Sequence, residues 1–339
     1  MYTELIMVIL GVSLILYTLL GGADFGAGII ELFVGDRANS TVSRAMAPVW
    51  EANHMWLIIA IVILFNGFPK AYTVLSTNLH IPVLLFLVAI ILRGTAFTFR
   101  HYDAFKDESQ KLYSGIFRYS SFFAVLFLGI TVGAFFGGTF LPDTSAGFLD
   151  QYIFPWFNWF CLSVGIFIVA ISAYIAAIFL LGEVKTDEGY LLLRKFVSRL
   201  FVVSAIAGIA IFLISFFEGL VFHEYFINHP LSIACVVLAS LLIPWIFRLM
   251  HQRKVWTLRF VVGTQIMFIL LGWFIIQWPN LVIFKDGSTL SMYEAAGPEA
   301  TMFILFMALA IGVVIIFPGL YYLSKIFKSE KEELKIREN

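Results

Sequence analysis

Residues 6–30 read IMVILGVSLILYTLLGGADFGAGII, and Asp24 is the only charged side chain among them. About 20 apolar residues in a helix span the hydrocarbon core of a membrane, so this segment predicts a transmembrane helix. Glu4 stands where a secretory signal would carry basic residues, and the apolar run is far longer than the core of such a signal. We therefore expect this helix to be retained in the mature protein.

The rest of the chain repeats this pattern. Hydrophobic residues make up 61% of the 339 residues and charged residues only 13%, which excludes an ordinary soluble domain. Apolar runs of membrane-spanning length lie at about 3–33, 46–67, 79–99, 115–138, 156–182, 198–218, 230–250, 257–278 and 300–327. We predict an all-α, multi-pass integral membrane protein with nine transmembrane helices in a single membrane domain, 1–339, ending in a short polar tail at 328–339.

The basic residues predict the orientation of these helices. Most of the 22 Lys and Arg residues follow the odd-numbered runs or close the chain, whereas the even-numbered connections hold only Lys70 and Lys285. Cytoplasmic loops of membrane proteins are enriched in Lys and Arg. The N-terminus is therefore expected outside the cell and the C-terminus in the cytoplasm.

Three ionisable residues interrupt the first three runs: Asp24, Glu51 and Arg93. A charged side chain at the centre of a membrane helix costs about 2.5 to 3.5 kcal/mol on insertion scales, so each needs a partner, a proton or a function. At 1.5 Å per residue, the predicted topology puts all three within about 9 to 15 Å of the cytoplasmic helix ends. We expect them to share that side of the membrane.

Asp24 and Arg93 have a structural interpretation as well as a functional one. The spacing of Tyr17, Gly21, Asp24, Gly28 and Glu31 predicts one helical face, on which Gly21 and Gly28 allow close helix packing. Arg stays charged, so Arg93 requires an anion: Asp24, Glu51 or a group of another chain. A simple Asp24–Arg93 ion pair and a proton-relaying Asp24 are both consistent with the sequence.

Glu51 opens the second run beside Pro48, where the helix dipole alone stabilises a carboxylate. Desolvation would instead turn it into an exchangeable proton carrier, which is the interpretation we favour. His54 lies on the same side of this helix and either passes protons on or, as we favour, hydrogen-bonds the Glu51 carboxylate. Trp50 and Trp56 flank the segment near the membrane interface, where aromatic residues are common and pack helix ends.

The remaining histidines and acids predict no metal site. Glu218, His223, Glu224 and His229 lack the spacing of a zinc motif and are interpreted as an outer loop or a subunit contact. His80, His101 and His251 lie at run boundaries rather than within a run, where a haem ligand would be expected. We therefore expect no haem to be ligated by this chain.

Three ordered motifs resemble one family. They are Gly22-Ala-Asp-Phe-Gly-Ala-Gly28, Pro48-Val-Trp-Glu-Ala-Asn-His-Met-Trp-Leu57 and Leu92-Arg-Gly-Thr-Ala-Phe-Thr-Phe-Arg100, with a looser match at Ser172-Ala-Tyr-Ile-Ala176. Together with the length and the nine spans, they resemble subunit II of cytochrome bd ubiquinol or menaquinol oxidase.

This resemblance implies a fold of two four-helix bundles, helices 1–4 at about 3–138 and 5–8 at about 156–278, with a peripheral helix 9 at about 300–327. It implies a prokaryotic cell-membrane complex with subunit I, which carries two b-type haems and one d-type haem, oxidises quinol and reduces dioxygen to water. A small third single-helix subunit and a structural quinone or lipid would also be consistent with the family. By this resemblance Glu51 and Asp24 belong to a proton route from the cytoplasm, and Arg93 is their electrostatic partner.

Two other functional classes fit the same residues. A proton-coupled transporter is suggested by the glycine-interrupted first helix and the buried charges. A purely structural partner subunit would use the same charges to bind another chain.

Overall fold

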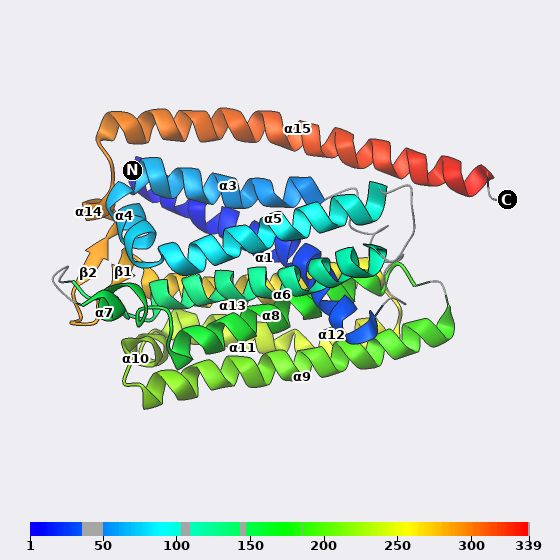
Figure 1. Cartoon of the computed structure of the whole chain (residues 1–339), viewed down its shortest axis with the longest axis horizontal. Helices are drawn as coiled ribbons and strands as arrows, with labels where there is room; N and C mark the ends of the chain where they lie inside the picture. The colour runs from blue at the N-terminus through cyan, green and yellow to red at the C-terminus, as the bar shows by residue number, and fades with distance from the viewer. Residues whose placement is uncertain (36–49, 103–108, 143–146, 185, 338–339) are drawn as a thin grey trace.

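The computed structural model describes residues 1–35, 50–102, 109–142, 147–184 and 186–337. Its long helices lie side by side along one direction (Figure 1). They are α1 (Tyr2–Val34), α3 (Trp50–Gly67), α5 (His80–Tyr102), α6 (Ser109–Phe136), α8 (Trp159–Leu180), α9 (Asp187–Phe217), α11 (Pro230–Leu241), α12 (Ile243–His251), α13 (Val255–Gln277) and α15 (Glu299–Arg337).

Within the described residues, eight helices are long and apolar enough to cross a membrane. The number rises to nine if α3 and α4 (Pro69–Asn78), which meet at an angle of 113°, count as one bent span. The span that ends at His251 consists of α11 and α12, because the helix is interrupted at Leu242, just before Pro244. The prediction of a multi-pass helical membrane protein is confirmed.

Short elements close one end of the helices, here called the hairpin end. The antiparallel strands β1 (Asn280–Ile283) and β2 (Thr289–Ser291) lie there with α4, α7 (Phe148–Tyr152), α10 (Val221–Ile227) and α14 (Met292–Ala295). The start of α1 is also at this end, whereas α15 finishes at the other (Figure 1). Such an arrangement requires an odd number of crossings between the two termini.

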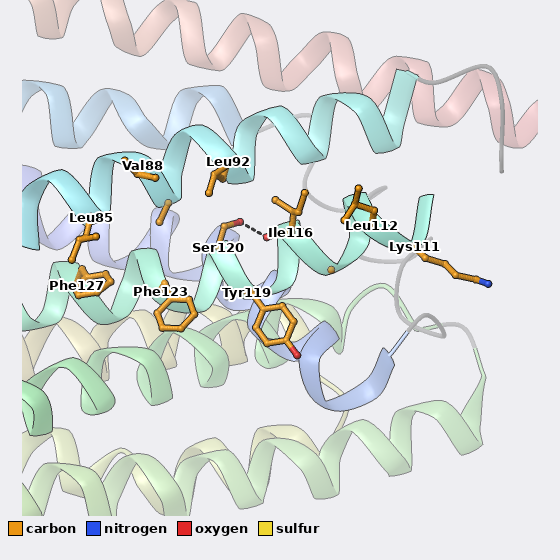
Figure 2. Close-up of a pocket in the computed structure, with 12 residues that line it drawn as sticks. Leu85, Val88, Leu92, Lys111, Leu112, Ile116, Tyr119, Ser120, Phe123 and Phe127 are labelled. Atoms are coloured by element: carbon orange, nitrogen blue, oxygen red, sulfur yellow. Dashed lines mark hydrogen bonds between the residues drawn. The ribbon is translucent and has the colours of Figure 1, made fainter. Parts of the chain in front are cut away.

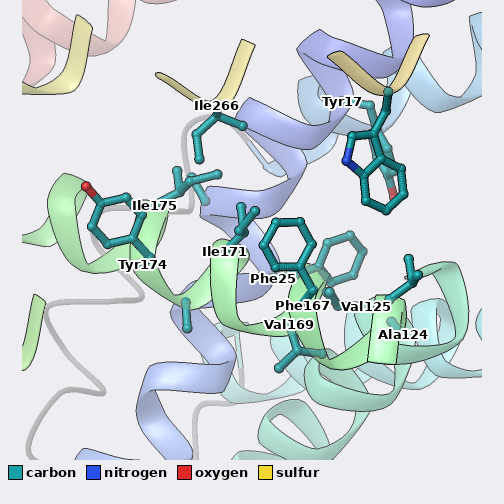
Figure 3. Close-up of a cluster of buried hydrophobic side chains, with 14 of the residues drawn as sticks. Tyr17, Phe25, Ala124, Val125, Phe167, Val169, Ile171, Tyr174, Ile175 and Ile266 are labelled. Carbon is teal, nitrogen blue, oxygen red and sulfur yellow. The ribbon is translucent and has the colours of Figure 1, made fainter. Parts of the chain in front are cut away.

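Helix α8 lies at the centre of the fold. It is the most buried of the candidate spans and packs against α1, α6 and α9. Phe167, Ile171 and Ile175 of α8 meet Phe25 of α1 and Val125 of α6 in one buried cluster (Figure 3). A helix that is apolar on all sides is suited to such a position, because neighbouring helices replace lipid around it.

Glycines allow α1 to approach its neighbours closely. A Cβ added at Gly26 would clash with the Ser172 carbonyl of α8, and one added at Gly28 would clash with the Ser121 hydroxyl of α6. Gly28 therefore lies close to α6, whereas the nearest atoms to Gly21 belong to Tyr17 of the same helix. Gly22 and Gly26, rather than Gly21, make the contact with α8.

Helix α9 begins about three turns before the predicted run at 198–218. Thr186 caps it by accepting a hydrogen bond from the Gly189 amide, and Asp187 and Glu188 lie in its first turn, where the dipole favours negative charge. Arg194, Lys195 and Arg199 consequently lie on a helix and not in a loop. The apolar run alone did not include this polar first part.

Candidate functional site

A buried ion pair joins α1 to α5. Arg93 Nη2 lies 2.6 Å from Asp24 Oδ1, and the two side chains are only 3% and 0% exposed. The same nitrogen donates to the Asp24 carbonyl at 3.1 Å. Of the anions that the sequence left open for Arg93, the structure therefore pairs it with Asp24.

The surroundings of Arg93 hold its guanidinium in place. Its Nε donates to the Ser121 hydroxyl at 3.1 Å, and that hydroxyl donates in turn to the Phe117 carbonyl of α6. The rings of Phe25 and Phe117 lie 4.7 and 5.1 Å from the guanidinium carbon, within the range of cation–π attraction. Three helices thus fix one positive charge deep in the protein.

A second buried ion pair lies two helical turns further along α1. Glu31 Oε2 accepts from Arg100 Nη1 at 2.8 Å, and Arg118 Nε of α6 is 3.6 Å from the same oxygen. Glu31 is fully buried, and Arg100 also lies 4.2 Å from the Phe117 ring. The Phe117 ring therefore lies between the cations of the two ion pairs.

The sequence analysis did not identify this second pair. Arg100 lies just beyond the predicted run at 79–99 and Arg118 at the start of the run at 115–138, and the structure places both on helices, because α5 extends to Tyr102 and α6 begins at Ser109. The available signal was the spacing of seven between Asp24 and Glu31 on α1 and between Arg93 and Arg100 on α5. Because the spacing is the same on two adjacent helices, each acid of α1 can pair with one arginine of α5.

His54 of α3 packs against two aromatic residues of α1 near the first ion pair. Its ring is half-buried and lies 5.7 Å from the Phe25 ring and 6.4 Å from the Tyr17 ring, centre to centre. Trp56, two residues further on, is buried. The side chains of Trp50 and Glu51 lie outside those that the structure describes, so the predictions for both remain predictions.

Several polar atoms around the two ion pairs are buried and have no hydrogen-bond partner within the described part of the chain. They include Asp24 Oδ2, Glu31 Oε1 and the Tyr17 hydroxyl, all on α1. Buried polar atoms are nearly always paired, so unpaired oxygens require an explanation. A carboxylate with one paired and one unpaired oxygen is able to accept a proton without losing its ion pair geometry.

Across the described ranges, no group of three or more His, Cys, Asp or Glu side chains is arranged to hold a metal ion. His223 lies beside the Ser215 hydroxyl, and His80 beside the Thr77 carbonyl, as ordinary hydrogen-bonding residues. His101 lies outside the described side chains.

An apolar groove of about 570 Å³ runs along α5 and α6 on the side away from the buried ion pairs (Figure 2). Leu85, Val88 and Leu92 line it from α5, and Phe123 and Phe127 from α6. Lys111 lies at the end of the groove that is farther from the hairpin end.

The comparison with known protein families gives one match over nearly the whole chain. Residues 2–327 match the model of cytochrome bd terminal oxidase subunit II. This chain belongs to that family. The three motifs that carried the resemblance contain Asp24 and Arg93, the residues that meet at the first ion pair.

Individual relatives match this chain over shorter segments. The chain is 30% identical over 99 residues to cytochrome bd ubiquinol oxidase subunit 2 of Bacillus subtilis, covering 29% of each protein. It is 30% identical over 94 residues to cytochrome bd-I ubiquinol oxidase subunit 2 of Escherichia coli K12, covering 27% of this chain and 25% of that protein. These alignments thus span under a third of each relative.

A solved structure shares the fold over almost the full length. A chain in the structure of bd oxidase from Geobacillus thermodenitrificans superposes with a TM-score of 0.77 and 19% identity, covering 96% of this chain and 98% of that one. Family and fold together identify a multi-pass bacterial membrane protein.

Proposed function

We propose that this chain is the haem-free subunit of a cytochrome bd-type quinol oxidase and contributes to the route by which protons reach the site of dioxygen reduction. The observation that carries this proposal is the buried Asp24–Arg93 pair, in which one carboxylate oxygen is bound and the other is buried without a described partner. Family membership supplies the reaction to which such a group would contribute.

In this proposal the membrane orientation follows from the loop charges. The hairpin end faces outward, and the opposite end, where α9 begins and α15 finishes, faces the cytoplasm. The nine crossings form two four-helix bundles, α1 to α6 and α8 to α13, with α15 at the periphery. Asp24 then lies about ten residues, or about 15 Å, from the cytoplasmic end of α1.

Glu51 acts in this scheme as the first proton acceptor on the cytoplasmic side, and Asp24 as the next. His54 lies one helical turn from Glu51 along α3 and contacts Phe25, the residue after Asp24. It is therefore suited to link the two acids, either by passing a proton or by orienting a hydrogen bond. Arg93 has no proton to give at physiological pH, so its part in this scheme is to hold the Asp24 carboxylate in place through the ion pair.

The reaction itself takes place in a partner. We assign the two b-type haems, the d-type haem and the quinol site to subunit I, as membership of the family implies. A small third subunit belongs to the same proposal. The groove of α5 and α6 is apolar along almost its whole length, as the tail of a structural lipid or quinone requires.

Purification through a tag on this chain tests the assignment. The proposal predicts that a haem-bearing partner is co-purified and that the complex has the absorption of d-type haem and oxidises quinol with oxygen. Isolation of this chain as a haem-free protein that functions alone would contradict it.

The two alternatives make different predictions. The transporter hypothesis relied on an interrupted first helix, but α1 is continuous from Tyr2 to Val34, and its glycines pack against α6 and α8. A purely structural role predicts that Glu51→Gln leaves the turnover of an assembled oxidase unchanged, whereas the proton-route proposal predicts a large loss.

A further inference from the structure

A cavity with one polar and one apolar wall lies between α9 and α12, at the end of the helices opposite the hairpin end. Its volume is about 330 Å³, and it is lined by Arg194 and Ser198 of α9 and by Phe247, Met250 and His251 of α12. No residue of the buried ion pairs contributes to it. The cavity therefore needs an explanation separate from the proton route.

The polar wall of the cavity consists of hydrogen-bond donors. Arg194 Nη1 is 3.0 Å from His251 Nδ1, and because a guanidinium only donates, Nδ1 must be the acceptor. A neutral imidazole that accepts at Nδ1 carries its proton on Nε2, which makes Nε2 a second donor. The guanidinium also has N–H groups on Nη2 and Nε, so the pair can donate several hydrogen bonds to an anion.

The neighbouring contacts hold this wall in position. The Tyr190 hydroxyl donates to the Met250 carbonyl at 2.8 Å, which ties the start of α9 to the end of α12. Arg253 lies 4.7 Å from the Tyr190 ring and forms an ion pair with Asp187. Asp187, two helical turns before Arg194 on α9, is therefore already paired with Arg253.

The other wall is apolar. Phe247 and Met250 face the cavity from α12, and both helices are parts of candidate membrane spans. Further basic residues, Lys195, Arg199 and Arg248, lie on the same ends of these helices. Basic pockets between transmembrane helices at a membrane surface are typical binding sites for anionic lipid headgroups.

We propose that this cavity binds the phosphate group of an anionic phospholipid, with the phosphate against Arg194 and His251 and the first part of an acyl chain against Phe247 and Met250. A free phosphate ion would satisfy the donors but would leave the apolar wall uncovered. A zwitterionic phospholipid would bring a cationic group next to Arg194 and His251. The combination of both walls therefore selects an anionic amphiphile.

Hydrogen–deuterium exchange of the purified complex in nanodiscs tests this proposal, with phosphatidylglycerol titrated into phosphatidylcholine. Phosphatidylglycerol is expected to slow amide exchange at residues 248–254, the end of α12 and the turn after it. Arg194→Gln should raise the phosphatidylglycerol content needed for this protection at least about tenfold, because a hydrogen bond to a charged group contributes about 1.5 to 3 kcal/mol.

Arg199→Gln is the matched control. It removes the same charge from the same helix, about 7.5 Å further along, but Arg199 is exposed and does not line the cavity. Its effect should stay within about threefold, since salt screens exposed charges over about 8 Å. His251→Leu, which removes a donor without a formal charge, should weaken the protection like Arg194→Gln.

Three results would overturn the proposal. The first is an equal effect of Arg194→Gln and Arg199→Gln, which would mean that only the general surface charge matters. Another is full protection by inorganic phosphate in phosphatidylcholine nanodiscs, which would identify a free-anion site. The third is the absence of any protection by phosphatidylglycerol in the unaltered complex.

Discussion

Arg93 of α5 and Asp24 of α1 meet at 2.6 Å, with both side chains removed from solvent. Taking two charges out of water is costly, and their attraction offsets this cost only while both are present. The ion pair is thus a weak source of stability but a strong constraint. Either residue alone would be a buried, uncompensated charge.

Removing Asp24 should therefore cost more than removing both residues. Asp24→Leu is expected to destabilise the protein by about 3 to 5 kcal/mol, the usual cost of breaking a buried pair from one side. The double variant Asp24→Leu with Arg93→Met should recover much of that loss. Denaturant unfolding of the purified complex measures the loss of unfolding free energy in each variant. A loss in the double variant equal to the sum of the losses in the two single variants would contradict the pairing.

The second ion pair predicts an order of effects. Arg100 is 2.8 Å from Glu31 and 4% exposed, whereas Arg118 is 3.6 Å away and 18% exposed. Arg100→Met should therefore lower the unfolding free energy more than Arg118→Met, because removing the better buried partner leaves Glu31 less compensated. Glu299→Gln, at an exposed acid at the start of α15, provides a control that should change little. The reverse order would show that the contacts of Arg118 dominate.

Gly26 should not tolerate a methyl group. A Cβ at this position would clash with the Ser172 carbonyl, and backbone atoms of a central helix have little room to move. Gly26→Ala should thus cost about 1 to 3 kcal/mol, as overpacking usually does. Gly11→Ala on the same helix is the matched control, because nothing lies within 4 Å of its added Cβ. It should be neutral or stabilising, since Ala favours helices. Thermal unfolding of the two variants compares them directly.

At the hairpin end, the capping box at Ser291 should respond to acid. The Ser291 amide and hydroxyl both donate to the Glu294 carboxylate, and these hydrogen bonds lower the pKa of Glu294 below its usual value. A lowered folded-state pKa gives stability that is present above the unfolded pKa, about 4.3, and is lost as the pH falls through the folded value. The protection factors of the amides at 291–295, taken relative to their intrinsic exchange rates at each pH, should thus fall on acidification below about pH 4, and Ser291→Ala should weaken this dependence. An acid response unaltered in that variant would contradict the assignment.

The periodicity and charge of the sequence predicted the helices well, because a membrane imposes a length and an apolar composition on each span. Arg93 could likewise be recognised as needing an anion. The pairing of Glu31 was missed because Arg100 and Arg118 lie at the ends of apolar runs, where polar residues fit either a loop or the end of a helix. The β-hairpin and the early start of α9 were missed because neither is determined by hydrophobicity. A turn joins the two strands, and the Thr186 cap fixes the first residue of α9.

The sequence also could not predict which glycine, Gly21 or Gly26, packs against α8. Both lie in the same small-residue segment, and only the position of α8 decides which of them meets Ser172. A motif indicates that a helix will be approached closely, whereas the rotation of the helix is determined by all its neighbours together.

The most direct test of the proton route is proton uptake by the complex in proteoliposomes during quinol oxidation, compared between the unaltered protein and Glu51→Gln. The account predicts that the variant retains its haem content but takes up protons, and turns over, at least about tenfold more slowly, as expected for the loss of a proton-transfer group. Glu299→Gln should leave both rates unchanged. Equal uptake and turnover in Glu51→Gln, with the complex fully assembled, would contradict the account.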